Sequence, residues 1–148
     1  MIFDNFFSKI VLSAIFFIIL LGIFWVYSPY SSDRIYMDFL SQIKFIKEIV
    51  INGHLDNGII KDISNVFNVT YWDKDKIILL SSYKTDITLY LGKNIYAEIK
   101  TVSNDGVVPV KSIVDVDSFL DDGLPNSGII KSLSSNYYSG CVIVVSLK

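Results

Sequence analysis

The densest group of carboxylates in this 148-residue chain lies between Asp115 and Asp122, in the run DVDSFLDD. A calcium loop needs oxygen donors at alternate positions, then a bend, and then a carboxylate that closes the site. Here Phe119 occupies the third donor position, and Asn126 stands where the closing carboxylate would be. We therefore expect these carboxylates to lie on the surface of a helix, with a calcium site as the alternative.

The single histidine and the single cysteine do not suggest catalysis. His54 lies in a predicted loop without a cysteine or carboxylate cluster spaced around it, which favours a surface histidine over a metal ligand or general base. Cys141 lies in the apolar run CVIVV, which predicts a buried strand thiol. Because the sequence also has no Gly-rich phosphate loop and no local Ser/His/Asp arrangement, we predict no enzyme activity, no catalytic residue, no cofactor and no metal.

The element that dominates the chain is an apolar run over residues 6–27. Between Ile10 and Val26 it carries no charge and consists largely of Ile, Leu, Val and Phe. As a helix, this stretch would cover roughly 26 Å, close to the hydrocarbon thickness of a bilayer. We expect a transmembrane helix within segment 1–30, with an aromatic belt at the membrane interface made by Trp25, Tyr27 and Tyr30. A cleaved signal peptide and a buried soluble helix are the alternatives, but no small-x-small cleavage site follows the run.

Charges around this run predict its orientation. Lys9 and the α-amine lie on its N-terminal side, whereas Asp33 and Arg34 on the other side cancel each other. We therefore expect a bacterial inner-membrane protein with its N-terminus in the cytoplasm and the domain 31–148 in the periplasm. The net charge of −2 is unlike that of a nucleic-acid-binding surface.

Segment 33–51 has the pattern of an amphipathic helix. Its apolar residues recur every three to four positions, while Asp38, Lys44 and Lys47 occupy the other side. We expect the apolar face to pack on its own domain. The alternative is a contact with a partner helix, and the candidate face for it comprises Tyr36, Phe39, Ile43, Ile46 and Val50.

The sequence after residue 67 alternates between apolar and polar side chains with a period of two, which predicts half-buried antiparallel strands. The expected strands span 68–72, 76–81, 86–91, 95–99 and, in the centre of the sheet, 141–147. Short helices are expected over 59–67 and 111–122, and segment 128–133 fits either a strand or a helix. The predicted fold class is α+β, with a transmembrane helix followed by a small antiparallel sheet that has helices on one face.

The order of these elements resembles the small PilM-type proteins of type IVb (thin) pilus systems. The resemblance includes Gly58-Ile59-Ile60 before the short helix and Ser139-Gly140 before the last strand. It implies an inner-membrane component of a pilus, secretion or conjugation machine, and it brings no catalytic residues. The implied partners are membrane lipid and other membrane or periplasmic proteins, with homo-oligomerisation left open.

The chain also resembles type IV pilins, in which an apolar helix continues into an amphipathic helix that precedes an α/β head. A prepilin has a glycine at its cleavage point and a glutamate at the fifth mature position, whereas this chain offers Asp4-Asn5 without an upstream glycine. We therefore expect a membrane-anchored structural or assembly component that acts through protein–protein contacts. A pilin-like filament subunit is the first alternative, and a membrane-anchored ligand-binding domain or enzyme is the second.

Overall fold

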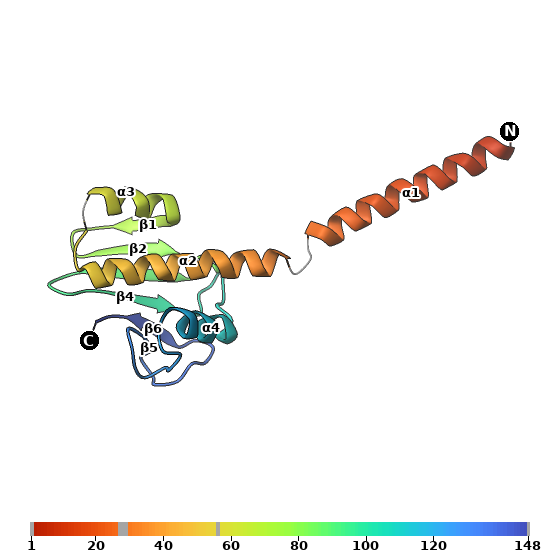
Figure 1. Cartoon of the computed structure of the whole chain (residues 1–148). Coiled ribbons are helices and arrows are strands. Elements are labelled where there is room, and N and C mark those ends of the chain that lie inside the picture. The colour runs from red at the N-terminus through yellow and green to blue at the C-terminus, as the bar shows by residue number, and fades with distance from the viewer. Residues whose placement is uncertain (1, 27–29, 56, 148) are drawn as a thin grey trace. The chain divides into compact units, whose positions relative to one another are not determined.

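The computed structural model describes residues 2–26, 30–55 and 57–147, and within them the side chains of residues 8–21, 32–55 and 58–147. The described backbone forms four helices and six strands (Figure 1). In chain order they are α1 (Ile2–Val26), α2 (Tyr30–Asn52), α3 (Asn57–Val66), β1 (Asn68–Trp72), β2 (Lys76–Leu80), β3 (Asp86–Leu91), β4 (Ile95–Lys100), α4 (Val110–Leu120), β5 (Ile130–Ser132) and β6 (Val142–Val145). The chain divides into two compact units, Met1–Arg34 and Ile35–Lys148.

The structure of the first unit contradicts the prediction of a membrane anchor. Among the helices that the structure describes, none combines the length and the apolar character needed to cross a membrane. The predicted single-pass helix over 6–27, and the inner-membrane location with a cytoplasmic N-terminus and a periplasmic domain, are therefore wrong.

The second unit contains an antiparallel sheet with the strand order β1-β2-β3-β4-β6-β5. Every pairing in it is antiparallel. The alternation in sequence sends every second side chain to one face, where Ile77, Leu79, Ile87 and Leu89 are completely buried. Strand β6 pairs with β4 on one side and with the edge strand β5 on the other, so it is an interior strand but lies second from one edge of the sheet and not at its centre as expected.

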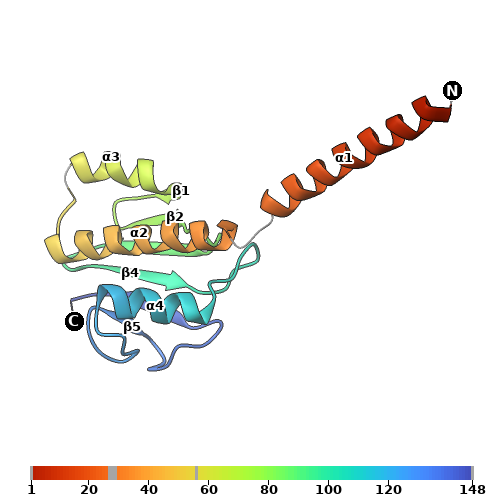
Figure 2. The ribbon, with the colours of Figure 1, turned by 45° about the vertical axis from the view of Figure 1, so that its right-hand side comes forward.

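Helices α2 and α4 cover one face of this sheet (Figures 1 and 2). The apolar side of α2 enters the core through Ile43, Ile46 and Val50. Helix α2 ends at Gly53, whose positive φ of 68° allows its N–H to bond to the carbonyl of Ile49 at 3.0 Å. The α+β arrangement of the second unit thus follows the sequence pattern.

The loops joining β2 to β3 and β4 to α4 approach each other closely at Gly106. A Cβ atom on Gly106 would lie 1.8 Å from the carbonyl oxygen of Tyr83, whereas a Cβ on Gly92 would find its nearest neighbour at 3.8 Å. We expect Gly106→Ala to lower the free energy of unfolding by about 2 kcal/mol or more, because backbone must move to admit the methyl group.

Urea denaturation of both alanine variants checks this prediction. Gly92→Ala is the matched control, since its methyl group meets only ordinary van der Waals distances. Its stability should stay within about 0.5 kcal/mol of the parent chain. Equal losses in the two variants would show that the contact between the loops does not restrict Gly106.

Candidate functional site

The residues predicted from sequence to form sites fall into two groups in the structure. The side chains of the expected aromatic belt, Trp25, Tyr27 and Tyr30, lie outside the residues whose side chains are described. The candidate partner-helix face lies in the second unit. Four of its five residues are buried in the domain core, namely Phe39, Ile43, Ile46 and Val50, and Tyr36 packs against that core. This face of α2 therefore contacts the sheet of its own chain.

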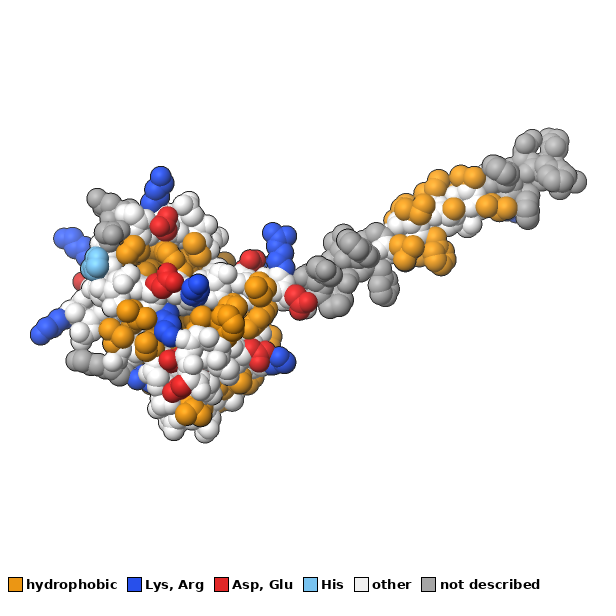
Figure 3. All heavy atoms as spheres, in the orientation of Figure 1, with side chains coloured by type: hydrophobic (Ala, Val, Ile, Leu, Met, Phe, Trp, Pro, Cys, Tyr) orange, Lys and Arg blue, Asp and Glu red, His pale blue; other side chains and the backbone are white. Residues whose placement is uncertain are grey.

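The described part of α1 presents an exposed apolar surface. Between Ile10 and Leu21, ten large apolar side chains are each 42–69% exposed. Figure 3 shows these side chains in orange along the described stretch of the helix. Contiguous exposed apolar surface of this kind marks an interaction site.

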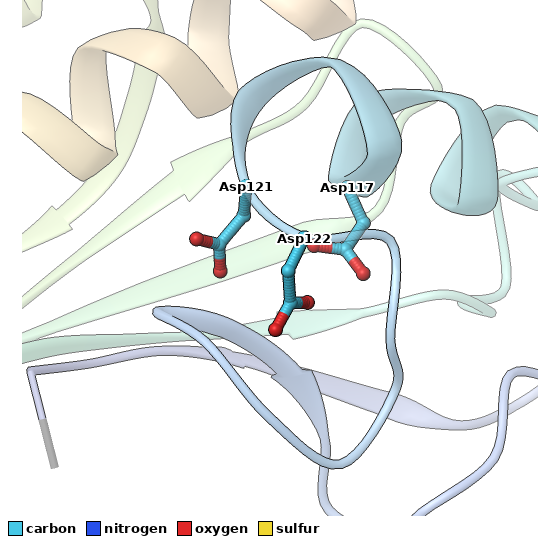
Figure 4. Close-up of side chains that lie close together, drawn as sticks. All are labelled: Asp117, Asp121 and Asp122. Carbon is cyan, nitrogen blue, oxygen red and sulfur yellow. The ribbon is translucent and has the colours of Figure 1, made fainter.

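A second feature is a group of three carboxylates at the C-terminal end of α4 (Figure 4). Asp117 lies in the last turn of α4, Asp121 is the C-cap residue that follows the helix, and Asp122 comes directly after it. One carboxylate oxygen from each of the three residues lies within 4.8 Å of the others. The negative end of the helix dipole adds to their charge, and no basic residue occupies the last turn of α4.

Asp121 organises the loop that joins α4 to β5. Its Oδ2 accepts the backbone N–H groups of Ile129 and Ile130, the latter at 2.8 Å. The Lys47 ammonium lies 3.8 Å from its Oδ1 and donates to the carbonyl of Leu120. Gly128 is required beside this carboxylate, because a Cβ there would lie 2.1 Å from Oδ2 and the residue has a φ of +73°.

Asp122 is held in its charged form by the same loop. Its two oxygens accept the hydroxyl of Ser127 at 2.6 Å and the backbone N–H of Leu124 at 2.9 Å. These hydrogen bonds, with that from Ser127 the larger cause, lower the pKa of the Asp122 carboxyl below its ordinary value. Asp122 therefore carries a negative charge at neutral pH.

Asp117 is the unusual member of the group because its side chain is completely buried. Its Oδ2 accepts the hydroxyl of Tyr137 at 2.6 Å. Its Oδ1 has no hydrogen-bond partner and, within the part of the chain that the structure describes, is the one buried side-chain atom in this condition. Burial raises the pKa of Asp117 from 3.8 to about 6, against the opposing effects of the hydrogen bonds from the Tyr137 hydroxyl and from the backbone N–H of Gly123.

This raised pKa predicts that the stability difference between the parent chain and Asp117→Asn changes with pH. Folded Asp117 holds its proton more tightly than unfolded Asp117, so the stability that it contributes is lost as the pH rises from about 4 through about 6. Asp117→Asn keeps an oxygen for Tyr137 and cannot ionise. We therefore expect the variant to gain stability relative to the parent chain between about pH 4.5 and pH 7, as measured by urea denaturation at both values. A stability difference that does not change with pH would contradict this expectation.

Three residues that the sequence singled out lie apart from these features. His54 is exposed, and its Nδ1 lies 2.8 Å from the carbonyl oxygen of Asn52. Cys141 is buried, as its apolar neighbours predicted. Asp115, which the sequence grouped with the other acids, pairs instead with Lys111 on the exposed side of α4. It therefore does not belong to the group of three.

A cavity of about 700 Å³ opens where α2, the β3–β4 turn and β6 end. Its wall is mainly apolar, with Val50, Ile95, Val144 and Leu147 among its lining residues. Lys93 and Tyr96 are the ionisable residues that line it, and no carboxylate or histidine of the described residues does so.

Comparison with protein-family models, with curated proteins and with solved structures finds no match for this chain. The resemblance to PilM-type proteins therefore stays a prediction from the order of the elements.

Proposed function

We propose that this chain is a structural component of a protein assembly and that α1 holds the assembly together by packing against α1 of other copies. The observation that supports this proposal is the exposed apolar surface between Ile10 and Leu21. Complete burial of a large apolar side chain contributes roughly 1.5–3 kcal/mol, and such contacts are the main driving force of association.

The distribution of the apolar side chains favours contacts on several sides of α1. Consecutive residues from Ile15 to Leu21 are all large, apolar and exposed, and seven residues occupy nearly two turns of helix. A helix in a two-stranded coiled coil needs only a stripe of apolar residues, whereas a helix that is apolar all round is buried on every side. We therefore propose a bundle of several α1 helices rather than a pair.

The kind of machine to which such a bundle would belong is a prediction from the resemblance described above. PilM-type proteins would place it in a type IVb pilus or in a related secretion or conjugation machine. The α2 helix, which packs on one face of an antiparallel sheet, also supports the second candidate, a pilin-like filament subunit. The two candidates differ in stoichiometry, because a closed bundle has a fixed number of chains and a filament grows without limit.

Sedimentation velocity of the full chain in detergent-free buffer, over a dilution series, tests the proposal. We expect one oligomer of defined mass for the closed bundle, or a length distribution that grows with concentration for the filament. A monodisperse monomer at all concentrations would contradict both forms of the proposal.

A further inference from the structure

The cavity of about 700 Å³ lies at the end of the sheet where the pairing of β4 with β6 stops. The antiparallel register between these strands ends at the pair Ala97–Val145. The next residues on both sides, 95–96 of β4 and 146–147 after β6, line the cavity instead of continuing this register. Val50, near the end of α2, completes part of the wall. The volume falls within the range of about 300–1,000 Å³ that is typical of small-molecule sites.

The apolar wall of this cavity reaches from the core to the surface. Val50 has no exposed surface and Ile95 is buried, whereas Leu147 is 60% exposed. The ring of Tyr96 stacks on that of Tyr90 with 4.6 Å between the centroids, which holds this part of the wall in place. An aliphatic chain can bury its methylene groups against such a wall, and each buried group strengthens binding.

Lys93 adds a positive charge to this apolar site. It lies in the turn between β3 and β4 and is the one charged side chain among the described residues that line the cavity. Lys93 is exposed, and it takes part in none of the ion pairs between described residues. The end of α2 contributes only a partial negative charge, and the carbonyl of Ile49 there already accepts the N–H of Gly53. A ligand with one negative charge next to an apolar chain therefore complements the site.

From this arrangement we propose that the cavity binds a monomeric aliphatic carboxylate. The chain lies against the apolar wall, and the carboxylate lies beside the ammonium group of Lys93. This proposal concerns the second unit alone and does not depend on the assembly proposed for α1.

Isothermal titration calorimetry of the full chain with octanoate, decanoate and dodecanoate, each below its micelle concentration, tests the proposal. We expect saturable binding of one ligand per chain, which becomes about five- to tenfold tighter with every two added methylene groups. Decyltrimethylammonium has an apolar chain of similar length and the opposite charge, and it should bind at least about tenfold more weakly than decanoate. Equal affinity for the anion and the cation, or an affinity that does not rise with chain length, would overturn the proposal.

Two charge reversals assign the ligand to this cavity. Lys93→Glu changes an exposed side chain, so the fold should persist, and it should weaken decanoate binding by about tenfold or more. Lys74→Glu is the matched control, because Lys74 is an exposed lysine in the turn between β1 and β2 and does not line the cavity. It should leave the affinity unchanged. Decanoate bound to the apolar surface of α1 instead would be weakened equally by both variants or by neither, and either result would contradict the proposal.

Discussion

Replacing Phe16 by aspartate is expected to dissociate the assembly proposed for this chain. Phe16 is 64% exposed in the single chain and lies among the consecutive apolar residues of α1. In a bundle its ring would be buried, so the variant would place a charge in an apolar contact and lose the burial of an aromatic side chain. We expect the dissociation constant between chains to rise about 100-fold or more, as measured by sedimentation velocity over a dilution series.

The matched control makes the same substitution in the second unit. Phe119 lies on α4 and is 72% exposed, so Phe119→Asp changes net charge and exposed apolar surface to a similar extent. This control should assemble like the parent chain. If Phe16→Asp and Phe119→Asp weaken assembly equally, the added charge alone explains the loss. If neither variant weakens assembly, α1 does not form the contacts between chains.

The second large effect is expected at Ile46, at the centre of the core. Ile46 has no exposed surface and lies on the side of α2 that faces the sheet. Ile46→Ala should lower the free energy of unfolding by about 2–5 kcal/mol, because the lost methylene groups leave a cavity. Urea denaturation at several protein concentrations measures this loss.

The concentration dependence decides what covers this face of α2. If Ile46 packs within its own chain, the loss does not vary with protein concentration, whereas a contact with a partner helix would make it vary. Met37→Ala is the matched control, because Met37 lies on the same helix and is 55% exposed. Its loss should be within about 0.5 kcal/mol. A loss at Ile46 that is equally small, or that varies with concentration, would contradict the core position.

In the second unit, local sequence patterns predicted the positions of strands but not their order in the sheet. The alternation from Ile87 to Leu91 and from Ile95 to Ile99 depends only on the two-residue period of a strand, and both strands form where they were expected. Segment 128–133 was ambiguous because a three-residue strand is too short to show a period; its pairing with β6 decides it. The strand order depends on contacts between distant segments, which a local pattern does not contain.

In the first unit, amino-acid composition alone led to a wrong prediction of a membrane-spanning helix. The apolar run from Ile10 to Val26 predicted a membrane-spanning helix, and the structure describes no helix suited to that role. Apolar side chains are stabilised by removal from water, but this preference does not distinguish between contact with lipid and contact with other protein side chains. The same composition suits contacts between protein helices, which we propose for α1.

The group of three carboxylates could be predicted only in part. A search for alternate donor positions grouped Asp115 with Asp117, whereas the structure groups Asp117 with Asp121 and Asp122, which follow the end of α4. The contributions of Tyr137 and Lys47 could not be found in this way. They lie 20 residues from Asp117 and 74 residues from Asp121 along the chain, and only the fold brings them together.

Thiol labelling of α1 in the assembled chain tests the central claim most directly. In Ile18→Cys the new thiol replaces a side chain that is 69% exposed in the single chain, Lys93→Cys provides an exposed reference, and the native Cys141 is buried. In an oligomer of defined mass, we expect a water-soluble maleimide to label position 18 at least about tenfold more slowly than position 93, because neighbouring helices cover it. Labelling of both positions at the same rate would contradict the claim that α1 is buried between chains.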